Sequence, residues 1–149
     1  RRMLKELIDL HRQGRLDEAE QGYRARLVEQ PDDVDALHLL GMLRHQRGDA
    51  AEGTRLLAQA QALAPDDASI ELSLASLHFR NGDHAAARYG FERALALDPN
   101  LGGAHAGSGQ LALLEGDSAR AEQHFRVALR TGEEPHALAG LGALSVKVV

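Results

Sequence analysis

The sequence predicts an all-α protein built from four copies of one helix pair. Ala and Leu, 25 residues each, make up a third of the 149 residues, and both favour helices. Proline and glycine recur with a fixed period of 34 residues, which indicates a repeat architecture. The residues that keep this period are Pro31, Pro65 and Pro99, and Gly14, Gly48, Gly82 and Gly116.

The first helix of a repeat is clearest in the second copy. Residues 34–46 carry Leu37, Leu40 and Leu43 at steps of three, which is a helical stripe and not the alternation of a strand. Gly48 ends this helix, because glycine adopts the left-handed conformation needed where the chain reverses. We therefore expect a helix over 34–46 and a tight turn after it.

The second helix begins at a capping signal. Asp49 precedes Glu52 by three residues, the spacing at which side chains satisfy the free amides of a first turn. Asp17 and Glu20 have the same spacing in the first repeat. Pro65 ends the helix, because it cannot donate the next hydrogen bond.

The same pattern divides the whole chain. We expect repeats at about 1–33, 34–67, 68–101 and 102–134, and a closing helix over 135–147. That last helix is apolar around most of its circumference, which predicts either a further repeat beyond it or a homo-oligomer formed through it. Gly102, Gly103 and Gly107 suggest excess flexibility in the first helix of the fourth repeat.

At this point the repeat resembles the tetratricopeptide repeat family. The family pattern has a small residue in the first helix, then a small residue, a large residue and an alanine in the second helix, and the chain keeps it except at Leu7 and Arg26. These series are Leu7, Gly41, Ala75 and Gly109; Ala19, Gly53, Ala87 and Ala121; Tyr23, Leu57, Phe91 and Phe125; and Arg26, Ala60, Ala94 and Ala128. Arg26 breaks the alanine series in the first repeat, so we expect that end of the repeat array to be frayed or to act as a cap.

The resemblance implies a right-handed α-solenoid of antiparallel helix pairs, in a single domain over 1–149 whose first helices line a concave groove. Met42 and Phe79 are the expected apolar anchors of that groove, and Arg80 the expected carboxylate partner. The implied groove residues are Leu4, Ile8, His11, His38, Met42, His45, Leu72, Ser76, Phe79, Arg80, Gln110 and Leu113.

Two known ligand-binding patterns of the family are missing from the sequence. The Lys and Asn clamp of chaperone-tail readers is replaced by Leu4, Ile8, Leu39, Ser69 and Ser73. The Asn ladder of sugar-transferring enzymes is replaced by Lys5, Leu39, Ser73 and Gly107 in one row and by Ile8, Met42, Ser76 and Gln110 in the other.

Composition excludes several classes of function. The chain has no Cys, so disulfides, Cys-based zinc sites and a cysteine nucleophile are ruled out. A net charge of -5 and only 3% aromatic residues argue against nucleic acid as a partner. We expect no metal site: His38 and His45 are about 10 Å apart along one helix. The carboxylate pairs Asp32-Asp33 and Asp66-Asp67 are expected to cap helices rather than act in catalysis.

The sequence therefore favours a non-catalytic scaffold that binds another protein or peptide, with no cofactor, no catalytic residues and no membrane insertion. The alternatives are a substrate-presenting arm of a larger glycosyltransferase, sulfotransferase or hydroxylase, and a scaffold of a bacterial envelope or secretion assembly. The richness in Ala, Arg and Gly suggests a bacterial source. The cytoplasm is slightly favoured as the compartment, and the periplasm stays open.

Overall fold

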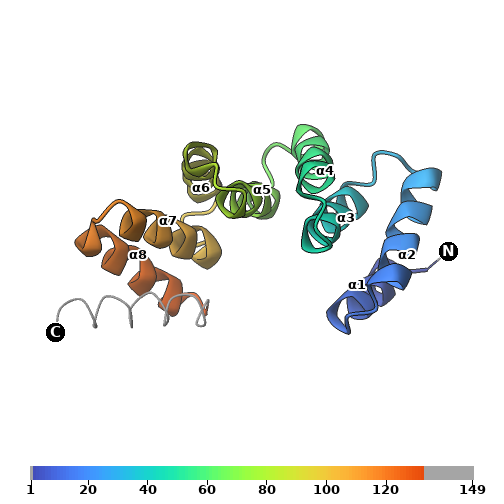
Figure 1. The fold of residues 1–149 in the computed structure, drawn as a ribbon, viewed down its shortest axis with the longest axis horizontal. Coiled ribbons are helices and arrows are strands. Elements are labelled where there is room, and N and C mark those ends of the chain that lie inside the picture. Colours follow the sequence, from blue (N-terminus) through green and yellow to red (C-terminus); the bar gives the residue numbers. More distant parts are fainter. Residues whose placement is uncertain (1, 133–149) are drawn as a thin grey trace. The chain divides into compact units, whose positions relative to one another are not determined.

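The computed structural model describes residues 2–132, and within that range it contains eight α-helices and no strand (Figure 1). The helices follow one another as four helix–turn–helix pairs, as the 34-residue period predicts. They are α1 (Leu4–Arg12), α2 (Leu16–Glu29), α3 (Val34–Gln46), α4 (Ala50–Leu63), α5 (Ala68–Arg80), α6 (His84–Leu97), α7 (Gly102–Leu114) and α8 (Ser118–Arg130). The expected closing helix over 135–147 lies outside the described residues.

Glycine makes the reversal inside each pair, as expected. The four glycines that recur every 34 residues all have positive φ: 79° at Gly14, 98° at Gly48, 84° at Gly82 and 80° at Gly116. Residues with a Cβ rarely adopt this conformation, so the period of the glycines is set by the period of the turns.

Aspartate side chains cap most of the helices. Asp33 accepts a hydrogen bond from the Ala36 amide, and Asp49 accepts one from the Glu52 amide. The prediction for Asp17 is wrong, because α2 begins at Leu16, two residues earlier than a cap at Asp17 requires, and has no side-chain cap. Asp17 lies inside the first turn instead.

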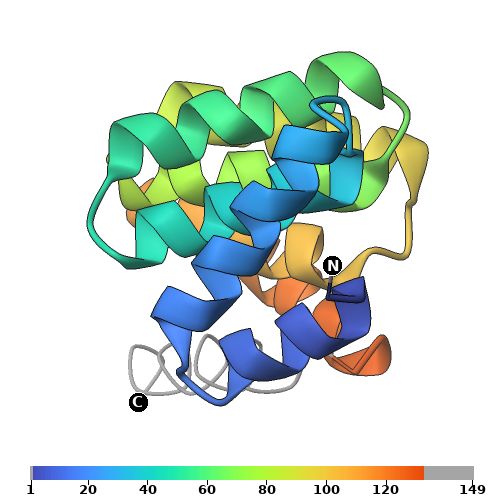
Figure 2. The same cartoon turned by 90° about the vertical axis from the view of Figure 1, so that its right-hand side faces the viewer.

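The chain divides into two compact units, Arg1–Pro65 and Asp66–Val149, which are described separately below. In the first unit, α1 and α2 form one hairpin, and α3 and α4 form the next (Figure 2). Arginine side chains from α3 and the turn after it link these hairpins: Glu20 of α2 accepts hydrogen bonds from Arg44 at 3.2 Å and Arg47 at 3.3 Å.

Small residues let the helices of a pair approach closely, but each pair places them differently. In the second pair a Cβ on Gly53 would lie 2.7 Å from the Gly41 carbonyl oxygen, so two glycines face each other. In the first pair Leu7 occupies the small position of α1, and Gly22 on α2 leaves room for it: a Cβ there would lie 2.0 Å from a Leu7 methyl. A large residue on α1, at a position that is small in the family, is therefore accommodated by a glycine on the opposite helix.

The predicted alanine series is confirmed as core. Ala60, Ala94 and Ala128 are fully buried, as are the large residues Tyr23 and Phe125. Fraying at Arg26 is not observed, since α2 continues to Glu29 and Arg26 pairs with the buried Asp33 at 3.0 Å. Arg26 therefore fastens α2 to the N-terminus of α3.

The glycines of α7 are packed closely, which corrects the expectation of excess flexibility for two of them. A Cβ on Gly107 would lie 2.3 Å from the Phe91 ring, and one on Gly103 would lie 2.8 Å from a Leu72 methyl. These glycines let α7 lie directly against side chains of α5 and α6.

Candidate functional site

A groove between α5 and α7 of the second unit encloses about 310 Å³. Side chains of α5 form one wall, small residues of α7 form the other, and the Phe91 ring of α6 forms part of the lining. The lining residues are Leu72, Ser76, Phe79, Arg80, Phe91, Gly103, Ala106, Gly107 and Gln110. We call this feature the α5–α7 groove.

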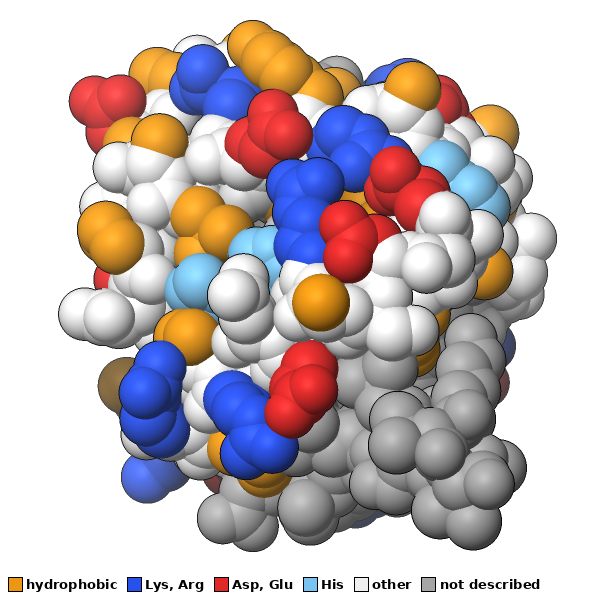
Figure 3. Space-filling view, turned by 90° about the vertical axis from the view of Figure 1, so that its left-hand side faces the viewer, with side chains coloured by type: hydrophobic (Ala, Val, Ile, Leu, Met, Phe, Trp, Pro, Cys, Tyr) orange, Lys and Arg blue, Asp and Glu red, His pale blue; other side chains and the backbone are white. Residues whose placement is uncertain are grey.

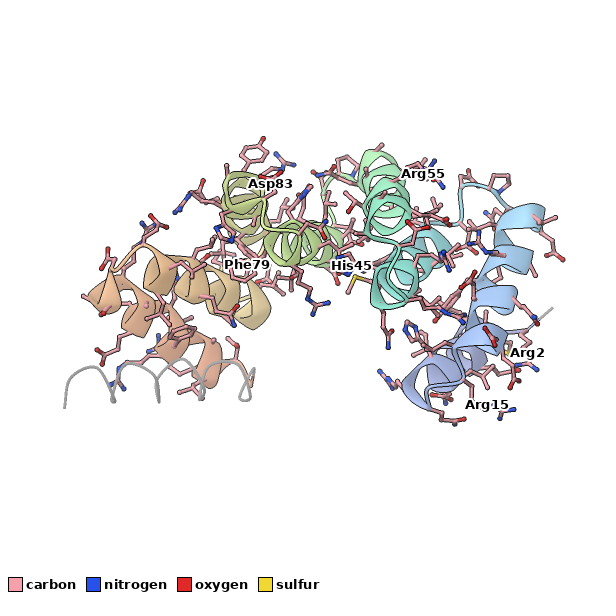
Figure 4. All side chains as sticks on the ribbon, in the orientation of Figure 1. Arg2, Arg15, His45, Arg55, Phe79 and Asp83 are labelled. Atoms are coloured by element: carbon pink, nitrogen blue, oxygen red, sulfur yellow. The ribbon has the colours of Figure 1, made fainter. Side chains whose placement is uncertain are left out.

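Helix periodicity explains the composition of the first wall. Leu72, Ser76, Phe79 and Arg80 follow one another at steps of four, three and one, which places them on neighbouring positions of one helix face. Phe79 is half-buried and packs against the core formed by Phe91 and its neighbours. Figure 4 shows Phe79 on the side of α5 that faces α7. The groove therefore has an apolar wall that the core holds in place.

The opposite wall is shallow because α7 carries glycine there. Gly103 and Gly107 are partly exposed, and α7 approaches so closely there that a Cβ would overlap a Leu72 methyl or the Phe91 ring. The backbone of α7 at these two glycines thus forms part of the wall, directly beside Leu72 and the Phe91 ring.

The polar side chains of the groove differ in whether they already make a hydrogen bond or an ion pair within the described residues. The Ser76 hydroxyl donates a hydrogen bond to the Leu72 carbonyl oxygen at 2.9 Å, so its proton is used within α5. Arg80 is exposed, and within residues 2–132 it makes no ion pair or side-chain hydrogen bond. The guanidinium is permanently charged, so Arg80 presents a cation at the end of the apolar wall.

Five of the predicted groove residues thus lie together in the α5–α7 groove: Leu72, Ser76, Phe79, Arg80 and Gln110. Leu113 does not line it, and instead packs against the core cluster that contains Phe125. Sequence reasoning missed Phe91, Gly103, Ala106 and Gly107 as lining residues. Phe91 belongs to the series of large residues with a 34-residue period, which marked it as a core residue. Nothing in the sequence showed that its ring would also line a groove.

The other predicted residues belong to the first unit. Leu4, Ile8, His38, Met42 and His45 are half-buried on α1 and α3. His38 and His45 each already make an interaction, so neither is a free ligand group. Figure 4 labels His45 near the end of α3.

His11 is engaged on both sides of its ring. Nδ1 lies 3.3 Å from the Tyr23 hydroxyl and Nε2 lies 2.8 Å from Oε1 of Gln46. The Tyr23 hydroxyl also donates to the Leu7 carbonyl oxygen at 3.4 Å, and burial raises the pKa of Tyr23 to about 12. His11 therefore connects α1 to α2 and α3, a role that its place in the predicted groove did not suggest.

A second depression, of about 260 Å³, lies between α6, α7 and α8. Its charged residues include both signs: Arg88 and Arg120, and Glu92 and Glu115. Arg88 hydrogen-bonds Glu115, so part of this charge is balanced within the protein. Figure 3 shows basic and acidic side chains lying next to each other on one face of the molecule, with histidine side chains among them.

A histidine pair adjoins this depression. Nδ1 of His105 lies 3.1 Å from Nδ1 of His124, and Nε2 of His105 lies 2.8 Å from the Pro99 carbonyl oxygen. Since a carbonyl only accepts, His105 Nε2 donates to it, and in the neutral state His124 must donate across the pair. Burial, the neighbouring His105 and Arg120 lower the pKa of His124.

Within the described residues, His, Cys, Asp and Glu side chains nowhere form a group of three positioned to hold a metal ion. No helix among residues 2–132 is long and apolar enough to cross a membrane.

Comparison with known proteins agrees with this architecture. A tetratricopeptide repeat model matches residues 39–102 and 72–135, which together span more than half of the chain. The chain therefore belongs to the tetratricopeptide repeat family. No curated protein matches its sequence.

Solved structures with the same fold include a thermophilic tetratricopeptide repeat protein from Thermus thermophilus. It has 21% identity and a TM-score of 0.84, over 97% of this chain and 80% of that one. The first tetratricopeptide repeat domain of Spaghetti (RPAP3), bound to an HSP90 peptide, has 18% identity and a TM-score of 0.69, over 77% of this chain and 92% of that one. At these identities the likeness shows the fold alone.

An O-GlcNAc transferase from Thermobaculum terrenum is also similar. It has 27% identity and a TM-score of 0.78, over 85% of this chain. The match covers only 25% of the transferase chain. The fold of the family is consistent with a protein-interaction scaffold, for which another protein or a peptide is the expected partner.

Proposed function

We propose that this protein is a non-catalytic scaffold that binds a segment of another protein in the α5–α7 groove. The observation that carries the proposal is the groove itself: an apolar wall of α5 backed by the Phe91 ring, opposite a wall of α7 that includes Gly103 and Gly107. Burying the half-exposed Leu72 and Phe79 side chains under a ligand would supply a favourable hydrophobic term.

The dimensions of the groove suit one or two side chains of a peptide. About 310 Å³ is at the lower end of the volumes typical of small-molecule sites. A helix or extended segment that lays its apolar residues along α5 fits this shape, which is a common mode of peptide recognition. The Spaghetti (RPAP3) domain bound to an HSP90 peptide supports this proposal as an example of peptide binding on the same fold.

A selection from random peptides tests the proposal. Twelve-residue peptides displayed with fixed flanking sequences are selected against the whole protein, and the affinities of the enriched peptides are measured by calorimetry. We expect Phe79→Ala to weaken binding at least tenfold, because the variant removes most of the apolar wall. Tyr89→Ala is the matched control, since Tyr89 is an aromatic residue of α6 that is 63% exposed outside the groove.

Phe79 also packs against the core, so a second variant separates binding from folding. Ser76→Leu places a larger side chain in the groove without removing a core contact, and we expect it to block binding while thermal unfolding changes little. Equal affinity in wild type, Phe79→Ala and Ser76→Leu would contradict the proposal. Failure to enrich any binding peptide would also count against it.

A second candidate function is a substrate-presenting arm of a larger enzyme, and the similarity to the O-GlcNAc transferase supports it. The test is to sequence the coding DNA on both sides of this segment. An adjoining transferase, sulfotransferase or hydroxylase domain in the same reading frame would favour the arm, and stop codons without such a domain would reject it.

A further inference from the structure

Within residues 2–132, the positive charge in the α5–α7 groove is not balanced by a carboxylate. Among the described residues that line the groove, Arg80 alone carries a charge, and the others are apolar, glycine or neutral polar residues. Arg80 has no carboxylate partner within residues 2–132. A ligand in the groove therefore meets an unpaired cation.

The depression between α6, α7 and α8 provides a comparison within the same unit. There, Arg88 and Arg120 are accompanied by Glu92 and Glu115, and Arg88 already hydrogen-bonds Glu115. A ligand carboxylate at that place would meet protein carboxylates as well as arginines. Of these two depressions, the α5–α7 groove is the one that offers a cation without a competing acidic lining residue.

The positions of the lining residues give the expected ligand a direction. Leu72 and Arg80 are separated by eight residues of α5, about 12 Å along the helix axis. Phe79 directly precedes Arg80, so the apolar wall and the cation adjoin. The Gln110 amide, on α7, is a second side-chain donor in the groove. An apolar side chain thus fits along α5, with an acceptor group close to it at the Arg80 end.

The acceptor expected there is a side-chain carboxylate rather than a chain terminus. Capture of a terminal carboxylate commonly uses several converging backbone amides. Most lining residues of the two walls lie inside helices, where their amides donate to carbonyls of the same helix; Gly103, in the first turn of α7, is the exception, and one amide is not a converging set. Arg80 and Gln110 are the side-chain donors that remain, and a guanidinium binds a carboxylate with two parallel hydrogen bonds.

We propose that the segment bound in the α5–α7 groove carries an Asp or Glu beside its apolar anchor, and that this carboxylate pairs with Arg80. This inference rests on the proposed function of the groove. It goes further by naming the chemistry of the partner: an acidic, amphipathic segment lying within a protein chain.

The displayed peptides described above also test this inference, because their fixed flanks remove any free terminal carboxylate near the variable residues. We expect the enriched peptides to share an Asp or Glu one to four residues from a Leu, Ile, Met or Phe. Changing that acidic residue to its amide should weaken binding to the wild type about tenfold, the size expected for a charge-assisted hydrogen bond. The same change should have no effect on binding to Arg80→Gln.

Charge reversal and a matched control complete the test. Arg80→Glu should reject the acidic peptide and bind its Lys-substituted version more tightly than the wild type does. Arg130→Gln is the control, because Arg130 ends α8 as Arg80 ends α5, is exposed and has no ion pair within the described residues. It should leave the affinity unchanged.

The outcomes separate this inference from the proposed function. If Phe79→Ala weakens binding but the enriched peptides show no acidic preference, the carboxylate proposal is overturned and the groove stands. If the amide peptide loses equal affinity for wild type and Arg80→Gln, Arg80 is not the partner of the carboxylate. If Phe79→Ala and Ser76→Leu change nothing, the groove itself is refuted.

Discussion

Replacing Gly53 with Ala should destabilise the protein, although alanine favours helices. Gly53 lies inside α4, where the substitution alone would add about 1 kcal/mol of helix propensity. However, the new Cβ would lie 2.7 Å from the Gly41 carbonyl oxygen and 2.9 Å from the His45 Cβ. The carbonyl is part of the α3 backbone and cannot rotate away, so α3 and α4 must separate.

The expected size follows from these two opposing effects. Overpacking a well-packed contact costs typically about 1 to 3 kcal/mol, and the loss of contacts along the α3–α4 interface places Gly53→Ala in the upper part of that range. After the gain in propensity is subtracted, we expect a net loss of roughly 1 to 2 kcal/mol. Urea denaturation measures it as a lower midpoint with an unchanged slope.

Gly103→Ala is the matched control, with the opposite expected sign. Its Cβ would lie 2.8 Å from a Leu72 methyl, the far end of a half-buried side chain that can move into the groove, and the next contact is at 3.5 Å. We expect this variant to be neutral or up to about 1 kcal/mol more stable. Equal or greater stability of Gly53→Ala relative to the wild type would refute the close-packing argument.

Three further predictions concern the core, an ion pair and pH. Ala94→Leu should overpack the fully buried Ala94 site and lower stability by about 1 to 3 kcal/mol in calorimetric melting; an unchanged melting curve would contradict the assigned register. Arg26→Ala should cost about 3 kcal/mol by leaving the buried Asp33 without its partner, and Arg26→Ala/Asp33→Ala should recover part of that loss; unfolding by urea compares them. The lowered pKa of His124 means that the folded state binds fewer protons than the unfolded state near pH 6. The contribution of His124 to stability is therefore complete above 6.5, the pKa of the unfolded state, and falls as the pH drops below that value. His124→Gln should flatten the pH dependence of the free energy of unfolding between pH 5 and 8. An unchanged slope in the variant would mean that other groups cause the pH dependence.

The sequence by itself determined the helix pairs and most of their boundaries, with the start of α2 as an exception. Gly48 and Pro65 mark where helices end because their backbone restrictions are local, and Asp33 and Asp49 cap helices through contacts only three residues away. Because the pattern recurs every 34 residues, the helix ends predicted in one repeat could be predicted at the equivalent positions of the other repeats. The resemblance to the family, and not the period alone, implied that Leu72, Phe79 and Arg80 share a surface, and all three line the α5–α7 groove.

Only the tertiary structure decided how neighbouring helices meet. Gly22 compensates for Leu7, Gly107 lies against the Phe91 ring, and His11 bonds Tyr23 and Gln46. Each of these contacts joins residues 12 or more positions apart on different helices, at distances that depend on the packing of specific side chains. Helix propensity describes a glycine by its own backbone alone. For this reason helix propensity predicted that Gly107 adds flexibility. In the structure, the Phe91 ring lies so close that only a residue without a Cβ fits at this position.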